Sequence, residues 1–193
     1  MRLVFGFGVN DANYVIERAV NGKSVKCKAF ETWKHIIERC HSEKSLKKWP
    51  TYIGVTVCEE WRSFMAFREW WMENHVDGWQ IDKDLLTDNR QYSPDNCIYV
   101  PSWLNNFTTG CDAARGEYPI GVDYHKKSNS FRSRCSNPAN GKREEVAGFK
   151  TPEAAHLAWR ARKLEYAAQK KSEMDAIDAR IYPRVVEIIN RAK

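Results

Sequence analysis

The sequence contains no long apolar run. No uninterrupted hydrophobic stretch approaches the roughly 18 residues that a membrane-spanning helix requires, so we expect no membrane partner. The opening segment, residues 1–8, is too short and too interrupted by glycine for a signal peptide. Together these two absences predict a cytoplasmic protein.

Cysteine pairs of the Cys-x-x-Cys type are also missing, although six cysteines are present. Cytoplasmic cysteines stay reduced, so disulfides are not expected, and a metal site or buried thiols remain as alternatives. Internal repeats and low-complexity tracts are equally lacking. With an apolar fraction of 42% and eight Trp residues, the composition therefore indicates a globular protein rather than a disordered tail.

The net charge of +6 is unevenly distributed along the chain. Residues 1–110 contain 14 Lys and Arg and 14 Asp and Glu, whereas residues 111–193 contain 17 and 11. The segment 121–143 holds six basic residues and the single acid Asp123. Such a density favours a polyanion such as nucleic acid, although a solvated surface is the simpler explanation for a basic run taken alone.

In the N-terminal half, periodicity and turn residues predict a hairpin and two helices. Apolar residues flank Asn21-Gly22, the strongest short hairpin signal in the chain. Apolar residues recur at helical spacing over 30–40 and again over 64–71, where Ser63 suits the N-cap position. Residues 44–54 contain a proline and a glycine and are predicted to form a loop between the helices.

After Gly78 the predicted order is strand, loop, strand and helix. Residues 79–86 have the character of a strand, and 87–96 that of a polar loop. Residues 97–100 follow as a second strand, and a short helix can begin at Pro101, since proline is tolerated in the first helical turn.

This arrangement resembles the ββα-metal motif of the His-Asn-His (HNH) endonucleases, as found in phage homing endonucleases. Asp82 in the first strand, Asn96 just before the second strand and Asn105 in the helix match the motif. The resemblance covers about residues 14–107. It implies a nuclease in which Asp82 and Asn105 hold a divalent ion, Mg²⁺ or Mn²⁺, at the phosphodiester, while Asn96 orients the general base.

The imidazole that serves as general base in that family is missing here. Lys83 stands at its position, and an ammonium group cannot accept a proton. Three interpretations follow: His75 or His41 supplies an imidazole from a neighbouring element, Lys83 itself acts as the base, or the site has lost activity. Asp82 and Asn96 also suit a turn and a strand end, where Asx side chains are common.

Four cysteines lie in or beside the segments that resemble the HNH family, namely Cys27, Cys40, Cys58 and Cys97. Four thiolates would make a closed tetrahedral Zn²⁺ site, and a small domain gains stability from such a site. Their irregular spacing makes this a weak signal. Buried free thiols explain the same residues at least as well, because cysteine is among the most buried residue types.

Beyond a linker placed at 109–117, strand-like segments at 120–124, 131–135 and 144–149 precede a helix that Thr151-Pro152 opens. We expect this helix to continue past Lys170, Pro183 to break or kink it, and residues 185–189 to add a final amphipathic turn. Phe131, Phe149, Trp159 and Tyr166 are predicted to form the core between the strands and the helix.

Residues 118–168 resemble the Apetala/ethylene-response-factor DNA-binding domain, which phage homing endonucleases also carry. The resemblance rests on the three strands and the helix start in that order, and it implies a three-stranded antiparallel sheet that enters the major groove. Arg132 and Arg134 lie two apart on one strand and so share a face. The candidate DNA-binding residues are Tyr124, His125, Lys126, Lys127, Arg132, Arg134, Lys142 and Arg143.

The sequence therefore predicts an α+β protein with an HNH-like ββα-metal domain at 1–108, the linker, and a sheet-and-helix DNA-binding domain at 118–193 with a C-terminal helical extension. The leading expectation is a phage HNH homing-endonuclease-like protein in the host cytoplasm that nicks or cleaves double-stranded DNA with a divalent metal. The alternative is a catalytically inactive, nuclease-derived DNA-binding protein that acts as a repressor or anti-defence factor. A third possibility is a protein-interaction role for Trp61, Trp70 and Trp71, which core packing explains more simply.

Overall fold

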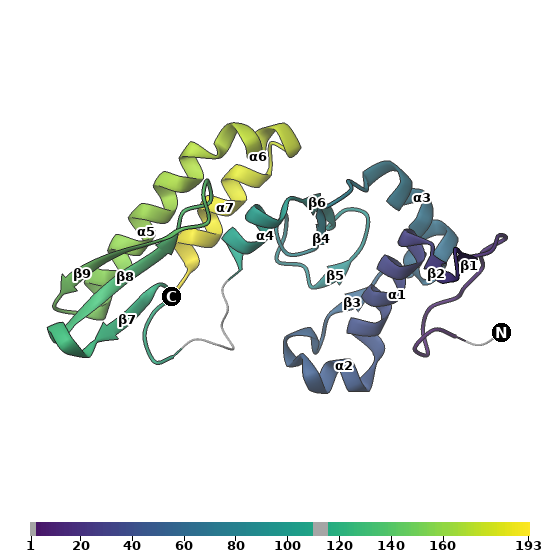
Figure 1. Cartoon of the computed structure of the whole chain (residues 1–193), viewed down its shortest axis with the longest axis horizontal. Coiled ribbons are helices and arrows are strands. Elements are labelled where there is room, and N and C mark those ends of the chain that lie inside the picture. The colour runs from purple at the N-terminus through teal and green to yellow at the C-terminus, as the bar shows by residue number, and fades with distance from the viewer. Residues whose placement is uncertain (1–2, 110–115) are drawn as a thin grey trace. The chain divides into compact units, whose positions relative to one another are not determined.

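The computed structural model describes residues 3–109 and 116–193, and its chain divides into two units, residues 1–99 and 100–193 (Figure 1). The predicted linker at 109–117 falls largely outside the described residues. The division precedes helix α4 (Ser102–Thr108), which groups with the C-terminal helices. No helix among the described residues is long and apolar enough to cross a membrane.

The first unit combines short strands with two longer helices, so it mixes α and β structure. Its elements are, in order, β1 (Glu17–Val20), β2 (Lys23–Lys26), α1 (Lys28–His41), α2 (Glu43–Lys48), β3 (Thr56–Val57), α3 (Phe64–Asn74), β4 (Gln80–Asp82), β5 (Gln91–Tyr92) and β6 (Ile98–Val100), whose last residue already belongs to the second unit. Strands β1 and β2 form a hairpin, β3 pairs in parallel with β5, and β4 pairs with β6.

The core of the first unit forms between α1 and α3, both of which were predicted. Trp33, Ile36 and Ile37 recur on one face of α1 and are fully buried. The Trp33 indole donates a hydrogen bond of 2.7 Å to the backbone carbonyl of Trp61, which satisfies a polar group that would otherwise be costly to bury. This pair fixes the segment that leads into α3.

Helix α3 begins as its sequence predicts. The Ser63 side chain accepts a hydrogen bond of 3.0 Å from the backbone N–H of Ala66, which caps the helix. Trp61 is fully buried, and Trp70 and Trp71 pack against the same hydrophobic core. Core packing thus accounts for these three tryptophans, and nothing in their placement favours a protein-interaction role.

Three predictions about the first unit are wrong in detail. The strand expected at 79–86 covers only Gln80–Asp82, because the Asp82 side chain closes a turn there. The expected loop at 44–54 contains α2, whose Ser42 cap accepts from the backbone N–H of Ser45 at 3.4 Å. The expected polar loop at 87–96 contains β5, which is held by its parallel partner β3 and by the buried Tyr92 ring. A strand pair as short as β3-β5 forms through tertiary contacts, so the local β-propensity of the sequence does not predict it.

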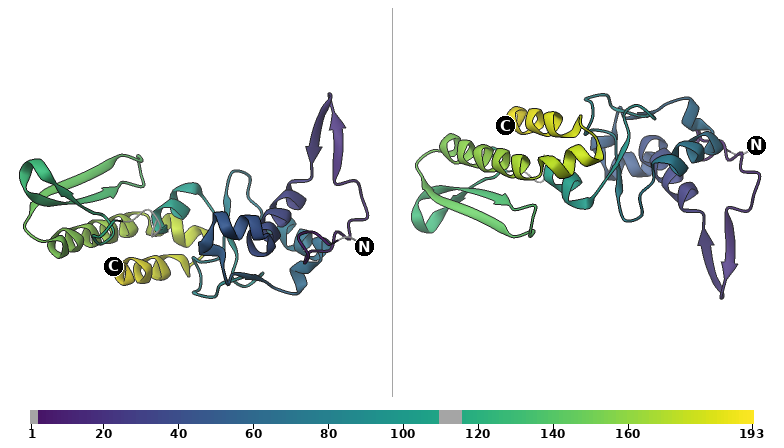
Figure 2. Two further views of the ribbon diagram at one scale, coloured as in Figure 1. Left: turned by 90° about the horizontal axis from the view of Figure 1, so that it is seen from below. Right: turned by 90° about the horizontal axis from the view of Figure 1, so that it is seen from above.

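The second unit consists of one sheet and the helices that cover it. Its elements are α4, β7 (Val122–His125), β8 (Ser130–Ser136), β9 (Arg143–Phe149), α5 (Pro152–Gln169), α6 (Lys171–Ile177) and α7 (Ile181–Arg191). The strands form a three-stranded antiparallel sheet in the order β7-β8-β9, packed against α5 (Figure 2). The α+β class and this sheet-and-helix arrangement are confirmed.

Helix α5 opens at Pro152 with the Thr151 hydroxyl capping the N–H of Ala154 at 3.2 Å, as predicted. Trp159 and Tyr166 are buried on its inner side, which confirms that part of the predicted core. Phe131 is only half-buried, and its ring packs against Tyr118 and Tyr124 instead.

The C-terminal helices depart from the prediction. Helix α5 ends at Gln169 instead of continuing past Lys170, whose ψ of 4° leaves helical geometry. Pro183 does not break a helix, because it lies in the first turn of α7, where backbone N–H groups have no intrahelical partner and proline is tolerated. Three helices therefore occupy residues 152–191 where we expected one long helix and a short turn.

Candidate nucleic-acid interface

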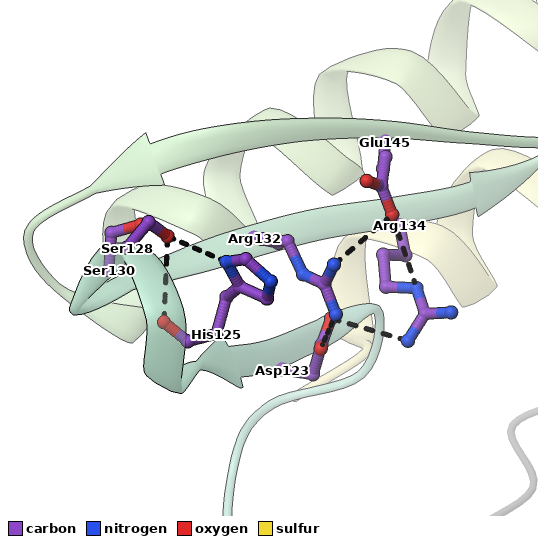
Figure 3. A network of polar contacts seen from close by, with 7 residues as sticks. All are labelled: Asp123, His125, Ser128, Ser130, Arg132, Arg134 and Glu145. Carbon is purple, nitrogen blue, oxygen red and sulfur yellow. Dashed lines mark hydrogen bonds and ion pairs between the residues drawn. The ribbon is translucent and has the colours of Figure 1, made fainter.

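The two faces of the β7-β8-β9 sheet differ in chemistry. Ser133 and Cys135 on β8 are buried on the side that packs against α5. Side chains alternate along a strand, so Arg132 and Arg134 project to the opposite side. We call that side the open face; Figure 3 shows it in front of the helices. The prediction that both arginines share one face is confirmed.

On the open face, the two arginines are held by two acids from the neighbouring strands (Figure 3). Asp123 on β7 lies directly opposite Arg132 and accepts a hydrogen bond from it, and its other oxygen lies 3.5 Å from Arg134. Glu145 on β9 lies opposite Arg134, with one oxygen 3.9 Å from that guanidinium and 3.6 Å from that of Arg132. The four charges form one connected network, which the sequence analysis did not anticipate.

The network shifts the pKa values of Asp123 and Arg132, each in the direction that favours its charged form. Partial burial alone would raise the pKa of Asp123, but the hydrogen bond from Arg132 and the charges of both arginines outweigh it, so the pKa lies below its usual value. The hydrogen bond to Asp123 raises the pKa of Arg132 in turn. Asp123 is therefore ionised at neutral pH, and the centre of the open face carries two positive and two negative charges.

The surplus positive charge lies at the two ends of the sheet. Lys126 and Lys127 are exposed in the turn that joins β7 to β8. Lys142 and Arg143 are exposed where the chain enters β9. All four are predicted DNA-binding residues, and none has an ion pair among the described residues. The interface thus has a charge-balanced centre with cations at both ends.

Tyr124 and His125, two further predicted DNA-binding residues, shape the turn after β7. The Tyr124 hydroxyl donates to the side chain of Asn129, which adopts the left-handed conformation with φ of 47°. The His125 ring lies 2.8 Å from the Ser128 hydroxyl through Nδ1 (Figure 3). These contacts fix the position of the lysines in the turn.

A groove of about 580 Å³ runs beside the open face and shares Asp123 and Arg134 with it. Its lining combines two aromatic rings with three cations, namely Tyr118, Tyr124, Lys126, Arg134 and Arg143. Tyr118 was missed by sequence reasoning, because it precedes the first predicted strand and follows no periodic pattern. The groove extends the candidate interface along the segment that leads into β7.

The HNH-like residues of the first unit have local structural roles. One oxygen of the Asp82 carboxylate accepts backbone hydrogen bonds from Asp84 at 2.7 Å and Leu85 at 2.9 Å, which closes a turn after β4. Burial raises the pKa of Asp82 despite these two bonds. Asn96 is buried, and its amide donates to the Gln91 carbonyl at 3.0 Å, which ties the end of the loop to β5.

Lys83, the residue at the position of the general base, points into the protein. Its side chain is only 7% exposed, and its ammonium group lies 2.5 Å from an Asp84 carboxylate oxygen and 5.6 Å from the centre of the Tyr92 ring. The ammonium group is thus held inside the protein beside a neighbouring carboxylate. The contacts explain Lys83 as a structural residue.

The two histidines considered as replacements for the base are engaged elsewhere. His75 stacks on Trp71 with 4.0 Å between ring centres and lies 3.2 Å from a carboxylate oxygen of Asp77. His41 stacks on Phe7 at 4.2 Å, and burial lowers its pKa. Among the described residues, neither imidazole is hydrogen-bonded to Asp82.

Asn105, the third residue of the HNH-like set, lies on α4 and so belongs to the second unit. Its backbone carbonyl accepts hydrogen bonds from the hydroxyls of Thr108 at 3.2 Å and Thr109 at 2.8 Å, which cap the end of that helix. The structure thus assigns Asp82 and Asn96 to one unit and Asn105 to the other.

The predicted metal ligands do not gather into a recognisable site. Across residues 3–109 and 116–193, no three His, Cys, Asp or Glu side chains are grouped so that they could hold a metal ion. Burial raises the pKa of the Cys40 thiol to about 11 and that of Cys97 to about 12. Cys27 contacts the Tyr14 hydroxyl at 3.3 Å, and Cys58 is a half-buried free thiol. The arrangement gives no support to the zinc site.

The donor set around Asp82 does not fit a catalytic divalent ion either. One of its carboxylate oxygens is occupied by two backbone amides, and the ammonium group of the next residue, Lys83, lies alongside. Magnesium and manganese ions favour several oxygen ligands, including one or two carboxylates with free oxygen atoms. The described residues around Asp82 therefore do not form the ligand set of a catalytic metal ion.

Comparisons with protein-family models, with curated proteins and with solved structures found no match for this chain. The two family resemblances therefore stay predictions from the sequence. What the structure establishes is coarser: an α+β fold that includes a three-stranded antiparallel sheet packed against a helix in the C-terminal unit.

Proposed function

We propose that this protein binds double-stranded DNA through the open face of the β7-β8-β9 sheet. The observation that carries the proposal is the arginine pair, Arg132 and Arg134, held side by side on that face with cations at both ends of the same sheet. Guanidinium groups fixed by ion pairs lose less conformational freedom when they meet a ligand. The sheet-and-helix resemblance from the sequence agrees with this role.

The residues at the centre and at the ends of the open face suit different contacts with DNA. Lys126, Lys127, Lys142 and Arg143 are exposed and suit contacts with the phosphate backbone, which position a protein on DNA without reading sequence. Arg132 and Arg134 at the centre can each present two N–H groups to the edge of a guanine in the major groove. Both sets of residues then contribute to affinity, and the central pair also contributes specificity.

The test is equilibrium binding of a mixed-sequence DNA duplex to the full chain and to the Arg132→Gln, Arg134→Gln double variant. We expect the double variant to bind at least about tenfold more weakly, since each well-placed arginine contact contributes roughly 1–3 kcal/mol. The matched control is Arg162→Gln with Arg180→Gln, which removes two exposed, ion-paired arginines from the same unit, one on α5 and one at the N-cap of α7. Equal losses in both variants would show that net charge, not the open face, governs binding.

Metal-dependent cleavage is the second candidate function, and only the HNH-like order of Asp82, Asn96 and Asn105 favours it. Supercoiled plasmid incubated with the protein and Mg²⁺ or Mn²⁺, or with a chelator, separates the two candidates. The donor set around Asp82 leads us to expect binding without nicking, as for a nuclease-derived repressor or anti-defence factor. Metal-dependent nicking that Asp82→Ala abolishes would instead establish the nuclease.

A further inference from the structure

The hairpin β1-β2 is built almost entirely from exposed residues. All eight residues of its two strands are exposed, and the hairpin projects from the rest of the first unit in both views of Figure 2. Only its base, at Ile16 and Cys27, packs against the core. A two-stranded hairpin is marginally stable by itself in water, so hydrophobic burial does not explain its presence.

The strand register assigns the hairpin residues to two chemically different faces. Arg18 pairs with Val25 and Val20 pairs with Lys23, so these four side chains share one face, which we call the cationic face. It carries two cations, two valines exposed by more than 40%, and no acid. The only acid of the hairpin strands, Glu17, lies on the other face, where its carboxylate accepts a hydrogen bond of 2.5 Å from Ser24.

The cations of this face are available to a ligand. Among the described residues, neither Arg18 nor Lys23 takes part in an ion pair. Lys28, two residues after the end of β2, is by contrast paired with Asp77 at 2.8 Å. Asn21 and Gly22, with φ of 53° and 73°, form the tight turn that holds Val20 and Lys23 opposite each other at the tip.

We infer that the cationic face of β1-β2 inserts into a groove of the same double-stranded DNA that the second unit binds, so this inference rests on the proposed function. The charge of the face is complementary to DNA, and its strands are on the order of 13 Å long at about 3.4 Å per residue. The major groove is about 12 Å wide and admits a two-stranded ribbon. In this arrangement Lys23 at the tip neutralises a phosphate, Arg18 reaches a base edge or phosphate, and the valines contact thymine methyl groups.

The test compares two double variants of the full chain in a titration of a mixed-sequence duplex over a series of salt concentrations. Arg18→Gln with Lys23→Gln removes the charge of the cationic face, and Lys47→Gln with Lys48→Gln removes equal charge from exposed positions on α2 in the same unit. We expect the hairpin variant to bind roughly tenfold more weakly, with a salt dependence flattened by about 1 to 2 units. The α2 variant should bind nearly as the unaltered protein does.

The outcomes separate this inference from the proposed function. If the unaltered protein does not bind DNA, the proposed function fails. If it binds, and the Arg132→Gln, Arg134→Gln variant weakens binding while the hairpin variant does not, the proposed function stands and the hairpin inference is overturned. Equal weakening by the hairpin and α2 variants would also overturn it, since the effect would then come from net charge. Both hairpin substitutions are at exposed positions, and circular dichroism checks that the variant is folded.

Discussion

At the scale of single residues, Gly121 shows how strictly one position determines the packing of the sheet on α5. Its φ of 76° lies in the left-handed region that favours glycine. A Cβ atom at this position would overlap the indole ring of Trp159, which is buried at the centre of α5. Two independent constraints, backbone conformation and space, therefore exclude any side chain here.

We predict that Gly121→Ala lowers the free energy of unfolding of the second unit by roughly 2–4 kcal/mol, from overpacking together with backbone strain. Urea denaturation followed by Trp fluorescence measures the change. Gly116→Ala is the matched control, because a Cβ there meets no atom within 4 Å. A stability for Gly121→Ala as high as that of the control would contradict the packing described for Trp159.

Lys163 on α5 is a second residue whose burial has a measurable effect, in this case on the pH dependence of stability. Its ammonium group donates to the Phe107 carbonyl at 2.5 Å and lies 3.5 Å from the centre of the Phe107 ring. Burial lowers its pKa from the ordinary 10.5 to about 8. Between these two values the unfolded chain holds a proton that the folded chain has lost, so this group makes folding more favourable as pH rises through that window.

We therefore predict that the free energy of unfolding of the natural protein, relative to that of Lys163→Met, increases between pH 8 and pH 10.5. At 1.36 kcal/mol per pKa unit the increase is at most about 3 kcal/mol, and solvent screening makes it smaller. Denaturation curves of both proteins across this range give the difference, in which the titration of other groups largely cancels. A difference that is flat or falls with pH would contradict the burial of Lys163.

At the scale of elements, the ion-pair network places two acids next to the arginines of the open face, so the face is not uniformly basic. Asp123 interacts with both arginines, so in the proposed complex with DNA it would compete with the phosphates for them. Binding of an incorrect sequence must offset these ion pairs without gaining guanine contacts. Asp123 thereby favours sequence-specific over non-specific binding.

Replacing Asp123 by Asn should raise the affinity for mixed-sequence DNA by roughly threefold to tenfold, because it adds one unit of positive charge and releases the arginines. Glu165→Gln is the control, since it removes an equal charge from an ion pair with Arg162 on α5. Anisotropy titrations with a fluorescent duplex compare the variants. Weaker binding by Asp123→Asn would mean that the acid positions the arginines rather than restrains them.

The sequence predicted correctly those turns and helix starts that a local residue pattern marks. The Asn21-Gly22 turn, the Ser63 cap and the Thr151-Pro152 helix start all lie where they were expected. Strand β5 and the end of α5 were missed because neither has a local signal. The parallel partner of β5 is distant in sequence, and no glycine or proline marks Lys170 as the end of a helix.

The candidate interface was predictable only in part, for the same reason. Spacing along β8 was enough to put Arg132 and Arg134 on one face. Their partners Asp123 and Glu145 depend on the register of three strands, including a shift between Phe131 and Arg132, which spacing within one strand does not reveal. The HNH-like order in the first unit likewise did not reveal that Lys83 points inward.

At the scale of the whole molecule, positive charge is concentrated where the structure has a surface that suits DNA. The first part of the chain, residues 1–110, contains equal numbers of basic and acidic residues, and its hairpin carries Arg18 and Lys23 on a face without an acid. The excess in residues 111–193 gathers at the ends of the β7-β8-β9 sheet. Binding to DNA should therefore release counterions in proportion to the phosphates that these cations contact.

The most direct test of the central claim is the salt dependence of DNA binding by the unaltered protein. The affinity for a mixed-sequence duplex is measured over a series of salt concentrations, and the logarithm of the association constant is plotted against the logarithm of salt concentration. Four to six phosphate contacts predict a slope of roughly −4 to −5, at about −0.9 per contact. No detectable binding at low salt, or a slope near zero, would contradict the proposal that this protein binds DNA through its cationic surfaces.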